Sequence, residues 1–242
     1  MLDKKRTKHS ALKSVLYPVL FGVLIIALWQ TGVLHKLLHT DTLILPLPSK
    51  IISIIKDGFP TIWANTRDTL IVVLPGLLIG SVIGYLLAIF ATYFPRFGGT
   101  GLNIIAAISA IPSVALAAVV LQWTRDVSTD VAVRSTVMKI IIVTVVSTAS
   151  MTLNAYRGLT ELKPFSLDLM KSYAASRTTV LLKLRIPNSL PYIFTSLKVS
   201  VPASVIAALV SEDFAEKVTG VGRQIRENII KAQYSTAWAY IV

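Results

Sequence analysis

Long apolar blocks separated by shorter polar stretches dominate this sequence. The blocks run over residues 15–34, 70–94, 102–123, 138–153 and 190–210, and a sixth starts near Tyr234. An α-helix needs about 20 residues to cross about 30 Å of hydrocarbon, whereas the strands of a membrane barrel would alternate apolar and polar residues. The pattern therefore predicts an all-α, polytopic integral membrane protein with about six transmembrane helices.

The sixth block is shorter than the others. Eight residues, Ser235 to Val242, follow its first residue. At about 1.5 Å per residue they cannot cross a bilayer. We therefore expect the printed sequence to stop inside this helix.

Composition supports the membrane interpretation. The 242 residues are 54% hydrophobic and 15% charged, and their mean hydropathy is +0.68, whereas soluble domains carry about 25% charged residues. The net charge of +12 does not indicate a nucleic-acid partner, because no basic run is interleaved with aromatic residues. Membrane lipid is the expected surrounding.

Lysine and arginine predict the orientation. Residues 1–14 hold five basic residues and one acid, and such segments stay in the cytoplasm. No small-residue cleavage site follows, so we interpret residues 15–34 as a retained first transmembrane helix. Residues 35–69 are then extracytoplasmic, with a short amphipathic helix, and residues 70–242 form the membrane core with a cytoplasmic loop at 157–188. Inner loops carry 12 basic and three acidic residues, against ten and nine outside.

Several kinds of chemistry lack their residues in this sequence. Cysteine is absent, and the three histidines, His9, His35 and His39, all lie near the N-terminus. The blocks hold no paired acids, no serine with histidine and no metal cluster, as an intramembrane enzyme would need. There is no glycine-rich ATP-binding loop. We expect no catalytic residue, cofactor or metal site, and no ATP hydrolysis by this chain alone.

The cytoplasmic loop contains an amphipathic stretch. On a helical projection of residues 165–184, polar and apolar side chains occupy opposite arcs, except that Arg177 falls in the apolar arc. A bend near residues 174–178 would resolve this and give two short helices. Pro187 should stop the second helix, and Pro191 suits the first turn of the next one. A helix lying on the membrane surface is an alternative explanation.

The stretch "AASRTTVLLKLRIPNSLP" resembles the EAA loop in permease subunits of binding-protein-dependent ABC importers. The usual form is close to E-A-A-x-x-x-G-A-S, then a short helix and L-P-x-x-x-P. Asp168, Leu169 and Met170 stand where Glu-Ala-Ala is usual, and Ala174 stands where glycine is usual. By this resemblance the residues that couple to an ATPase are Asp168, Met170, Lys171, Ala174, Ala175, Ser176, Arg177, Pro187 and Pro191.

Three further stretches carry the same resemblance. They are "LPLPSKIISII" (45–55), "SAIPSVALAAVVLQW" (109–123) and "VSEDFAEKVTGVGRQI" (210–225). Each is similar to a segment of permeases in the nitrate, sulfonate, taurine and thiamin-precursor branch. The resemblance thus extends along nearly the whole chain.

The resemblance implies a type I importer permease fold in the bacterial inner membrane, with a cytoplasmic N-terminus. It also implies partners: a second permease, identical or different, two ATP-binding subunits and an extracytoplasmic solute-binding protein. The energy-coupling subunit of a vitamin importer is the alternative within transport, but its paired Ala-Arg signatures are not found.

Candidates for the solute pathway come from polar residues and prolines in or near the blocks. They are Pro112, Ser196, Lys198, Ser200 and Glu212. An ionisable residue at membrane depth is a functional candidate, although the stem of Lys198 could equally reach the interface.

Other residues have simpler interpretations. Lys139 should reach the interface from the edge of its block, and Glu212 and Asp213 should belong to a solvated outer turn. Four small residues at four-residue spacing, Gly76, Gly80, Gly84 and Ala88, predict close helix packing.

Overall fold

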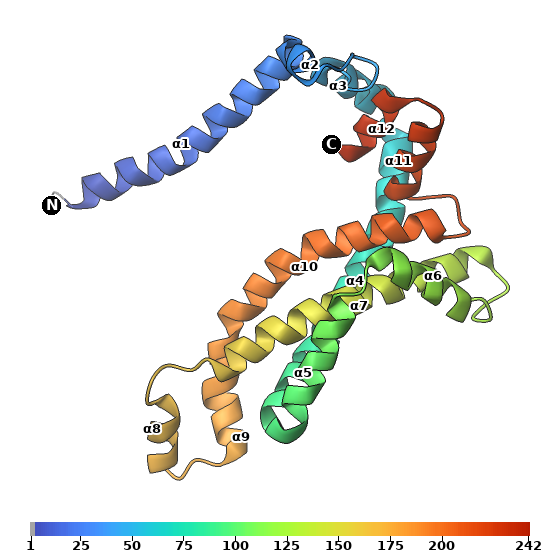
Figure 1. Cartoon of the computed structure of the whole chain (residues 1–242). Helices are drawn as coiled ribbons and strands as arrows, with labels where there is room; N and C mark the ends of the chain where they lie inside the picture. The colour runs from blue at the N-terminus through green and yellow to red at the C-terminus, as the bar shows by residue number, and fades with distance from the viewer. Residues whose placement is uncertain (1–2) are drawn as a thin grey trace. The chain divides into compact units, whose positions relative to one another are not determined.

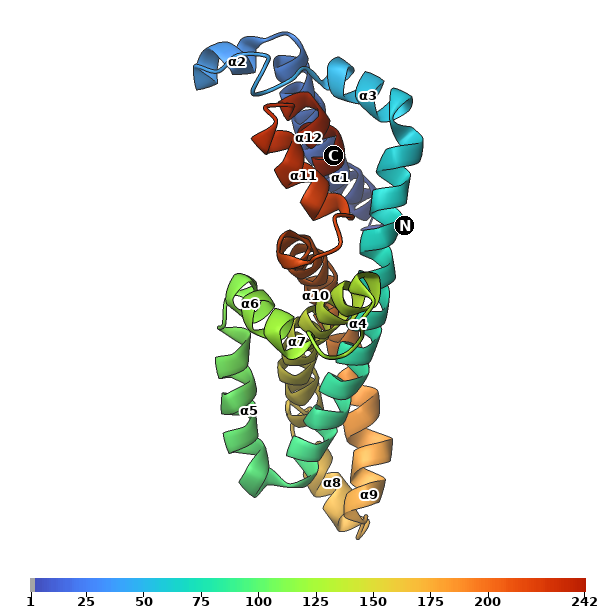
Figure 2. The ribbon, with the colours of Figure 1, turned by 90° about the vertical axis from the view of Figure 1, so that its right-hand side faces the viewer.

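The computed structural model describes residues 3–242, and the side chains of 16–96 and 98–242. These residues form helices and no strand (Figures 1 and 2), which confirms the predicted all-α class. The helices are α1 (Asp3–Gln30), α2 (Val33–Leu38), α3 (Pro48–Asp57), α4 (Phe59–Tyr93), α5 (Pro95–Ser109), α6 (Ser113–Trp123), α7 (Val131–Thr160), α8 (Ser166–Ser172), α9 (Arg177–Val180), the π-helical η1 (Leu181–Arg185), α10 (Ile186–Phe214), α11 (Val221–Ile230) and α12 (Tyr234–Ile241).

Three helical stretches of the described chain are long and apolar enough to span a membrane. They are α4, α7 and the continuous stretch Arg177–Phe214, which joins α9, η1 and α10. A fourth span results if α5 and α6 count as one, bent by 96° at their break. Pro112, which lacks a backbone N–H, lies at that break. The first predicted block appears as a shorter apolar helix, Leu16–Gln30, and α12 has eight residues.

The chain divides into two compact units, described separately here. The first comprises residues up to Trp63 together with Gln224–Val242. Within it, the rings of Trp29 and Trp238 meet edge-on at 5.6 Å, and the Trp238 indole N–H donates to the carbonyl of Ile44 at 3.0 Å. The edge-on ring contact thus ties α12 to α1, and the hydrogen bond ties it to the segment before α3.

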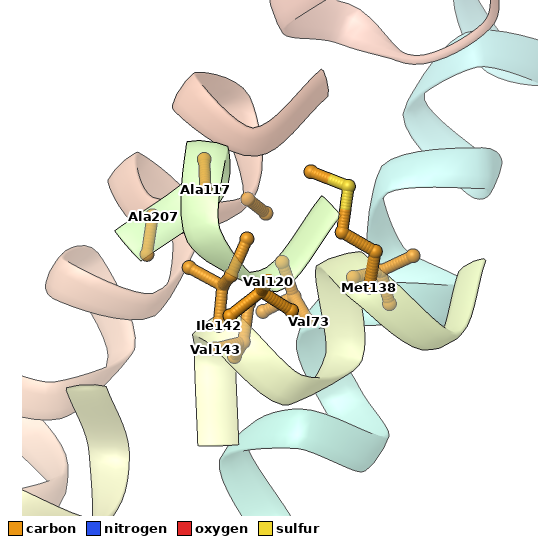
Figure 3. Close-up of a cluster of buried hydrophobic side chains, with 9 residues drawn as sticks. Val73, Ala117, Val120, Met138, Ile142, Val143 and Ala207 are labelled. Atoms are coloured by element: carbon orange, nitrogen blue, oxygen red, sulfur yellow. The ribbon is translucent and has the colours of Figure 1, made fainter. Parts of the chain in front are cut away.

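The second unit, Ala64–Arg223, is built around α7. This helix packs against α5, α6 and α10, and side chains from α4, α6, α7 and α10 form a buried core (Figure 3). Met138, Ile142 and Val143 of α7 are fully buried there, beside Val73 of α4 and Ala117 of α6. The seam of apolar side chains holds the four spans together by van der Waals packing.

The predicted close packing of the glycine stripe is confirmed. A Cβ at Gly80 of α4 would lie 2.5 Å from the carbonyl oxygen of Thr144 in α7, and one at Gly84 would lie 2.6 Å from that of Thr148. Only residues without a side chain permit this approach, so α4 and α7 lie backbone to backbone.

Hydrogen bonds between α4, α7 and α10 show the relative directions of these three helices. Near the starts of α4 and α7, Thr69 bonds Glu212 and Ser135 bonds Lys217. Near the ends of the same helices, residues at the start of α10 are bonded instead: Tyr85 to Ser189 and Gly158 to Asn188. Therefore α4 and α7 run in one direction and α10 in the other. We call the two extremities the Glu212 end and the α8 end.

Candidate functional site

The predicted break in the 165–184 segment is present. Helix α8 ends at Ser172 and α9 begins at Arg177. Between them Ala174 adopts a left-handed backbone with φ +49°, and the N–H of Ala175 donates to Met170 at 3.0 Å. Ala174 and Ala175 therefore form the turn. Glycine adopts positive φ without strain, which gives a physical reason for glycine at position 174 in the EAA loop pattern.

Ser176 begins the second helix. Its hydroxyl oxygen accepts from the backbone N–H of Thr179 at 3.2 Å and shares a hydroxyl hydrogen bond with the Thr179 side chain at 2.9 Å. Serine favours this position because its side chain satisfies an N–H that the first helical turn leaves free.

The expected stop at Pro187 is wrong. The helix continues from Arg177 to Phe214, because η1 opens the ladder to an i to i+5 pattern, with Ile186 N–H donating to Leu181. The wider turn accommodates a proline that has no N–H and would crowd the carbonyl four residues earlier. Pro187, and not Pro191, occupies the first turn of α10; Pro191 lies inside that helix.

Apolar side chains project from α8 and its two ends. Phe165 is 82% exposed, Leu169 58% and Tyr173 77%. Beside them Asp168 and Lys171 form an exposed ion pair at 3.0 Å, which contributes little to folding. Such a mixed patch indicates a surface for a partner or for lipid.

Side chains from η1 and α10 bind the carbonyls at the end of α7. Arg185 donates to Leu159 at 2.8 Å, and the Asn188 amide donates to Gly158 at 2.7 Å and to Glu161 at 3.1 Å. These bonds satisfy carbonyls that the last turn of a helix leaves free. The sequence analysis did not predict a role for either residue. The one local indication was the side-chain amide of Asn188, a possible hydrogen-bond donor directly after Pro187.

At the opposite end, Glu212 lies in a polar cluster with no exposed surface of its own. Its carboxylate accepts from the Thr69 hydroxyl at 2.7 Å and from the backbone N–H of Gly222 at 2.7 Å. The Thr69 oxygen also accepts from Val221 N–H at 3.0 Å, while Asn65 accepts from Gly220 N–H at 3.0 Å. Glu212 thus holds the 215–222 loop, in which we include the first two residues of α11, against α4.

Two expectations for this end are wrong. Glu212 is 0% exposed, so it is not in a solvated turn, and Lys139 is 2% exposed, so it does not reach the interface; Asp213 is half-buried. Lys139 lies among charges from three segments, Glu212, Asp68 and Lys217. Burying a charge is costly unless an opposite charge compensates it, and these partners come together only in the fold.

Two ion pairs border this cluster. Lys217 bonds Asp68 at 3.3 Å, and Arg134 of α7 pairs with Glu216. Both link the 215–222 loop to the starts of long helices. The loop is therefore fixed by charge as well as by hydrogen bonds.

The remaining pathway candidates do not form one group. Ser196 and Ser200 are 0% exposed on α10, and their hydroxyl oxygens have no hydrogen-bond partner among the described residues. Lys198 is exposed, on a different face of the same helix. Pro112 is exposed at the α5–α6 break. Among the described side chains, those of residues 16–96 and 98–242, no cluster of three or more His, Asp or Glu residues could hold a metal ion.

The comparisons with known proteins agree with this architecture. Residues 80–242 match the family described as "Binding-protein-dependent transport system inner membrane component". A probable ABC transporter permease protein of Haemophilus influenzae is 27% identical over 199 residues, 82% of this chain and 77% of that protein. The formylaminopyrimidine transport permease protein ThiX of Halalkalibacterium halodurans is 24% identical over 198 residues, 81% and 75% of the two chains.

Because the family match covers well over half of the sequence, the chain belongs to this family of inner-membrane transport components. It is a multi-pass membrane protein and a permease subunit of a binding-protein-dependent ABC importer.

Proposed function

We propose that residues 165–184 of this permease dock a separate ATP-binding subunit and transmit its movement to the membrane helices. The observation that carries the proposal is the exposed patch of Phe165, Leu169 and Tyr173, placed beside a turn of two alanines. Large apolar side chains around small ones form a surface into which a partner can pack.

The connection between this segment and the membrane supports transmission. From Arg177 the helix runs without interruption to Phe214. Leu181 and Ile186 also pack on the buried cluster that contains Met151 and Leu159 of α7. A displacement of α9 therefore moves α10 against α7. Coupling between distant sites needs such an element, whose position both sites bias.

The docking residues divide by position. The side chains of Asp168, Met170 and Lys171 belong to α8, Ala174 and Ala175 form the turn, and Ser176 and Arg177 start α9. Pro187 and Pro191 shape the helix behind them.

The orientation belongs to the same proposal. The α8 end and the N-terminus face the cytoplasm, as the basic residues predict, and the Glu212 end faces outward in the bacterial inner membrane. The solute-binding protein approaches the outer end, and a second permease, identical or different, completes the pathway. Reporter fusions at Ser10 and Ser176 should report the same side of the membrane; opposite sides would refute this topology.

The solute-pathway residues belong to the same proposal. Pro112, Ser196, Lys198, Ser200 and Glu212 all lie on or beside spans of the second unit. Glu212 acts there by holding the outer loop and not by touching solute, because it has no exposed surface.

Ala175→Trp tests docking. Ala175 is half-buried, so a bulky indole adds volume to a packed contact, at a cost of about 1 to 3 kcal/mol. We expect the variant to insert normally, to lose co-purification with a co-expressed ATP-binding subunit, and to lose solute-stimulated ATP hydrolysis in reconstituted vesicles.

Thr179→Ser is the matched control, because it keeps the hydroxyl that bonds Ser176. The permease alone should hydrolyse no ATP. If Ala175→Trp retained the subunit and its coupled hydrolysis as well as the parent, the segment would be a membrane-surface helix, since an added tryptophan favours that interface.

A further inference from the structure

A cavity of about 330 Å³ lies at the α8 end of the second unit. One wall is the corner between α4 and α5, with Thr92, Tyr93 and Pro95, and the other is the segment from α8 to η1. Figure 2 shows the α4–α5 corner and α8–α9 at the same extremity of this unit. The cavity therefore joins the proposed docking segment to two membrane helices.

The lining of the cavity is strongly cationic. It includes Lys171, Arg177 and Arg185 and no acidic residue. Lys171 is paired with Asp168, whereas Arg177 has no ion pair or hydrogen bond from its side chain to another described residue. A partly enclosed group of positive charges favours an anion.

Arg185 is oriented before any ligand arrives. One of its guanidinium N–H groups donates to Leu159, which leaves further donors of a group that carries five. Guanidinium and ammonium groups together suit the oxygens of a phosphate. Tyr93, whose side chain carries a hydroxyl donor, lines the opposite wall.

Aromatic rings indicate how deep the cavity lies in the membrane. The Phe94 ring lies 4.9 Å from that of Phe90 and 5.1 Å from that of Tyr93, at the end of the long apolar helix α4. Aromatic residues gather at the level of the lipid headgroups. The remaining walls, including Leu167, Val180 and Leu181, are apolar and suit the glycerol end of a lipid.

We propose that this cavity binds the phosphate of an anionic phospholipid from the inner leaflet. Basic pockets between membrane helices on the cytoplasmic side are suited to such headgroups; this part of the inference rests on the orientation under the proposed function. A bound phosphate contacts the α4–α5 corner through Tyr93 and the docking segment through Arg177 and Arg185. Anionic lipid therefore restrains the segment that moves the membrane helices.

The test measures lipid retention by the purified permease without any ATP-binding subunit. The chain is extracted from vesicles of phosphatidylcholine mixed with phosphatidylglycerol, or of phosphatidylcholine alone, and bound lipid is counted by native mass spectrometry. Arg185→Gln and Arg177→Gln each remove one cation from the cavity. Lys183→Gln removes an exposed cation of η1 that does not line it.

We expect the parent and Lys183→Gln to retain phosphatidylglycerol equally. Each arginine variant should bind it about fivefold more weakly, the effect of removing about one cation near an anionic headgroup. Inorganic phosphate should not displace the lipid, because it lacks the apolar contacts.

Equal retention by all three variants would overturn the site in favour of general surface charge. Displacement by inorganic phosphate would assign the cavity to a soluble anion. A separate co-purification uses the ATP-binding subunit and pure phosphatidylcholine. If Arg177→Gln lost the subunit there while the permease alone kept its lipid, the cavity would be assigned to an acidic side chain of that subunit. Since the side chain of Arg177 makes no internal hydrogen bond, its variant remains informative if Arg185→Gln fails to fold. Lipid retention does not depend on whether the segment docks a subunit, so the two proposals fail separately.

Discussion

The two ends of the second unit treat charge in opposite ways. At the Glu212 end, Glu212 and Lys139 are buried, and hydroxyl and backbone donors surround the carboxylate. At the α8 end, Asp168 and Lys171 are exposed, and Phe165 and Tyr173 lie open beside them. One end is completed by the chain itself, and the other presents groups that a partner or lipid can complete.

This difference is consistent with the proposal that an ATP-binding subunit docks at the α8 end only. The Glu212 end can hold its loop without help, since carboxylate, hydroxyl and amide groups satisfy each other within the fold. The α8 end has fewer buried polar contacts than the Glu212 end, and more of its side chains are exposed to a partner. Because one continuous helix, Arg177–Phe214, reaches from the open end to the closed end, the proposed docking predicts that a movement at the open end displaces the closed end.

The largest effect is expected for Glu212→Ala. The substitution leaves Lys139 buried without the acidic group that compensates its charge most, and it deprives Thr69 and Gly222 of their acceptor. Removing one member of a buried charged pair costs about 3 to 5 kcal/mol. The midpoint of thermal unfolding in detergent should fall strongly.

Glu216→Ala is the control for this prediction. Glu216 pairs with Arg134 but its side chain is 39% exposed, so the cost should stay at or below about 1 kcal/mol. Equal losses in the two variants would contradict the view that burial makes Glu212 essential to the closed end.

A smaller loss is expected for Gly220→Ala. Gly220 has φ +108°, and an added Cβ would overlap the Glu212 carboxylate. A strained backbone position costs about 1 to 3 kcal/mol, measured again as thermal unfolding. Gly99→Ala, where a Cβ meets nothing within 4 Å, should be close to neutral. An unchanged unfolding midpoint in Gly220→Ala would show that position 220 does not pack tightly against the Glu212 carboxylate.

Local patterns in the sequence predicted much of the fold. Block length predicted the long spans, and four-residue glycine spacing predicted the contact of α4 with α7, because both depend on neighbours along one helix. The break at Ala174 and Ala175 was predicted because Arg177 contradicted a single amphipathic helix. These features need no knowledge of which helices meet.

Features that depend on distant partners escaped prediction. Glu212 bonds Thr69, 143 residues away in sequence, and the charge of Lys139 is compensated by Glu212 and Asp68, which come from two other segments. Nothing in their own neighbourhoods distinguishes them from solvated charges. Proline does disfavour a helix in the residue before it, but the wider backbone hydrogen-bond pattern of η1 allows the helix to continue through Pro187.

The open end should lose binding without losing stability. Tyr173→Ala removes a 77% exposed ring, so the thermal midpoint should not change, as for most surface substitutions. If the ring anchors an ATP-binding subunit, affinity should fall by about tenfold, or about 1.4 kcal/mol, in a titration of that subunit. Phe194→Ala, 66% exposed on α10, removes a comparable ring outside the segment and should leave the affinity unchanged. A matching loss in both would remove the distinction between the α8 patch and the lipid-facing surface.

The smallest effect is expected for Ala174→Gly, which should strengthen the turn. An alanine at φ +49° carries about 1 to 2 kcal/mol of left-handed strain, and the greater freedom of glycine in the unfolded chain offsets about 0.4 to 1 kcal/mol of the relief. The difference leaves a local gain of about 0 to 1.6 kcal/mol, with a central value of about 0.8 kcal/mol. Since the turn is exposed, the global midpoint should stay constant, and the gain should appear as slower hydrogen exchange at Ala175, whose N–H bonds Met170.

Ala175→Gly makes the same chemical change one residue along, where φ is not positive. Only the entropic cost of glycine then applies, so exchange around the turn should become faster. Opposite signs at neighbouring alanines would locate the strain at position 174 and explain why the EAA loop pattern favours glycine there. Faster exchange in both variants would mean that the left-handed residue is not strained, and that the open end owes its turn to the contacts of α8 and not to backbone conformation.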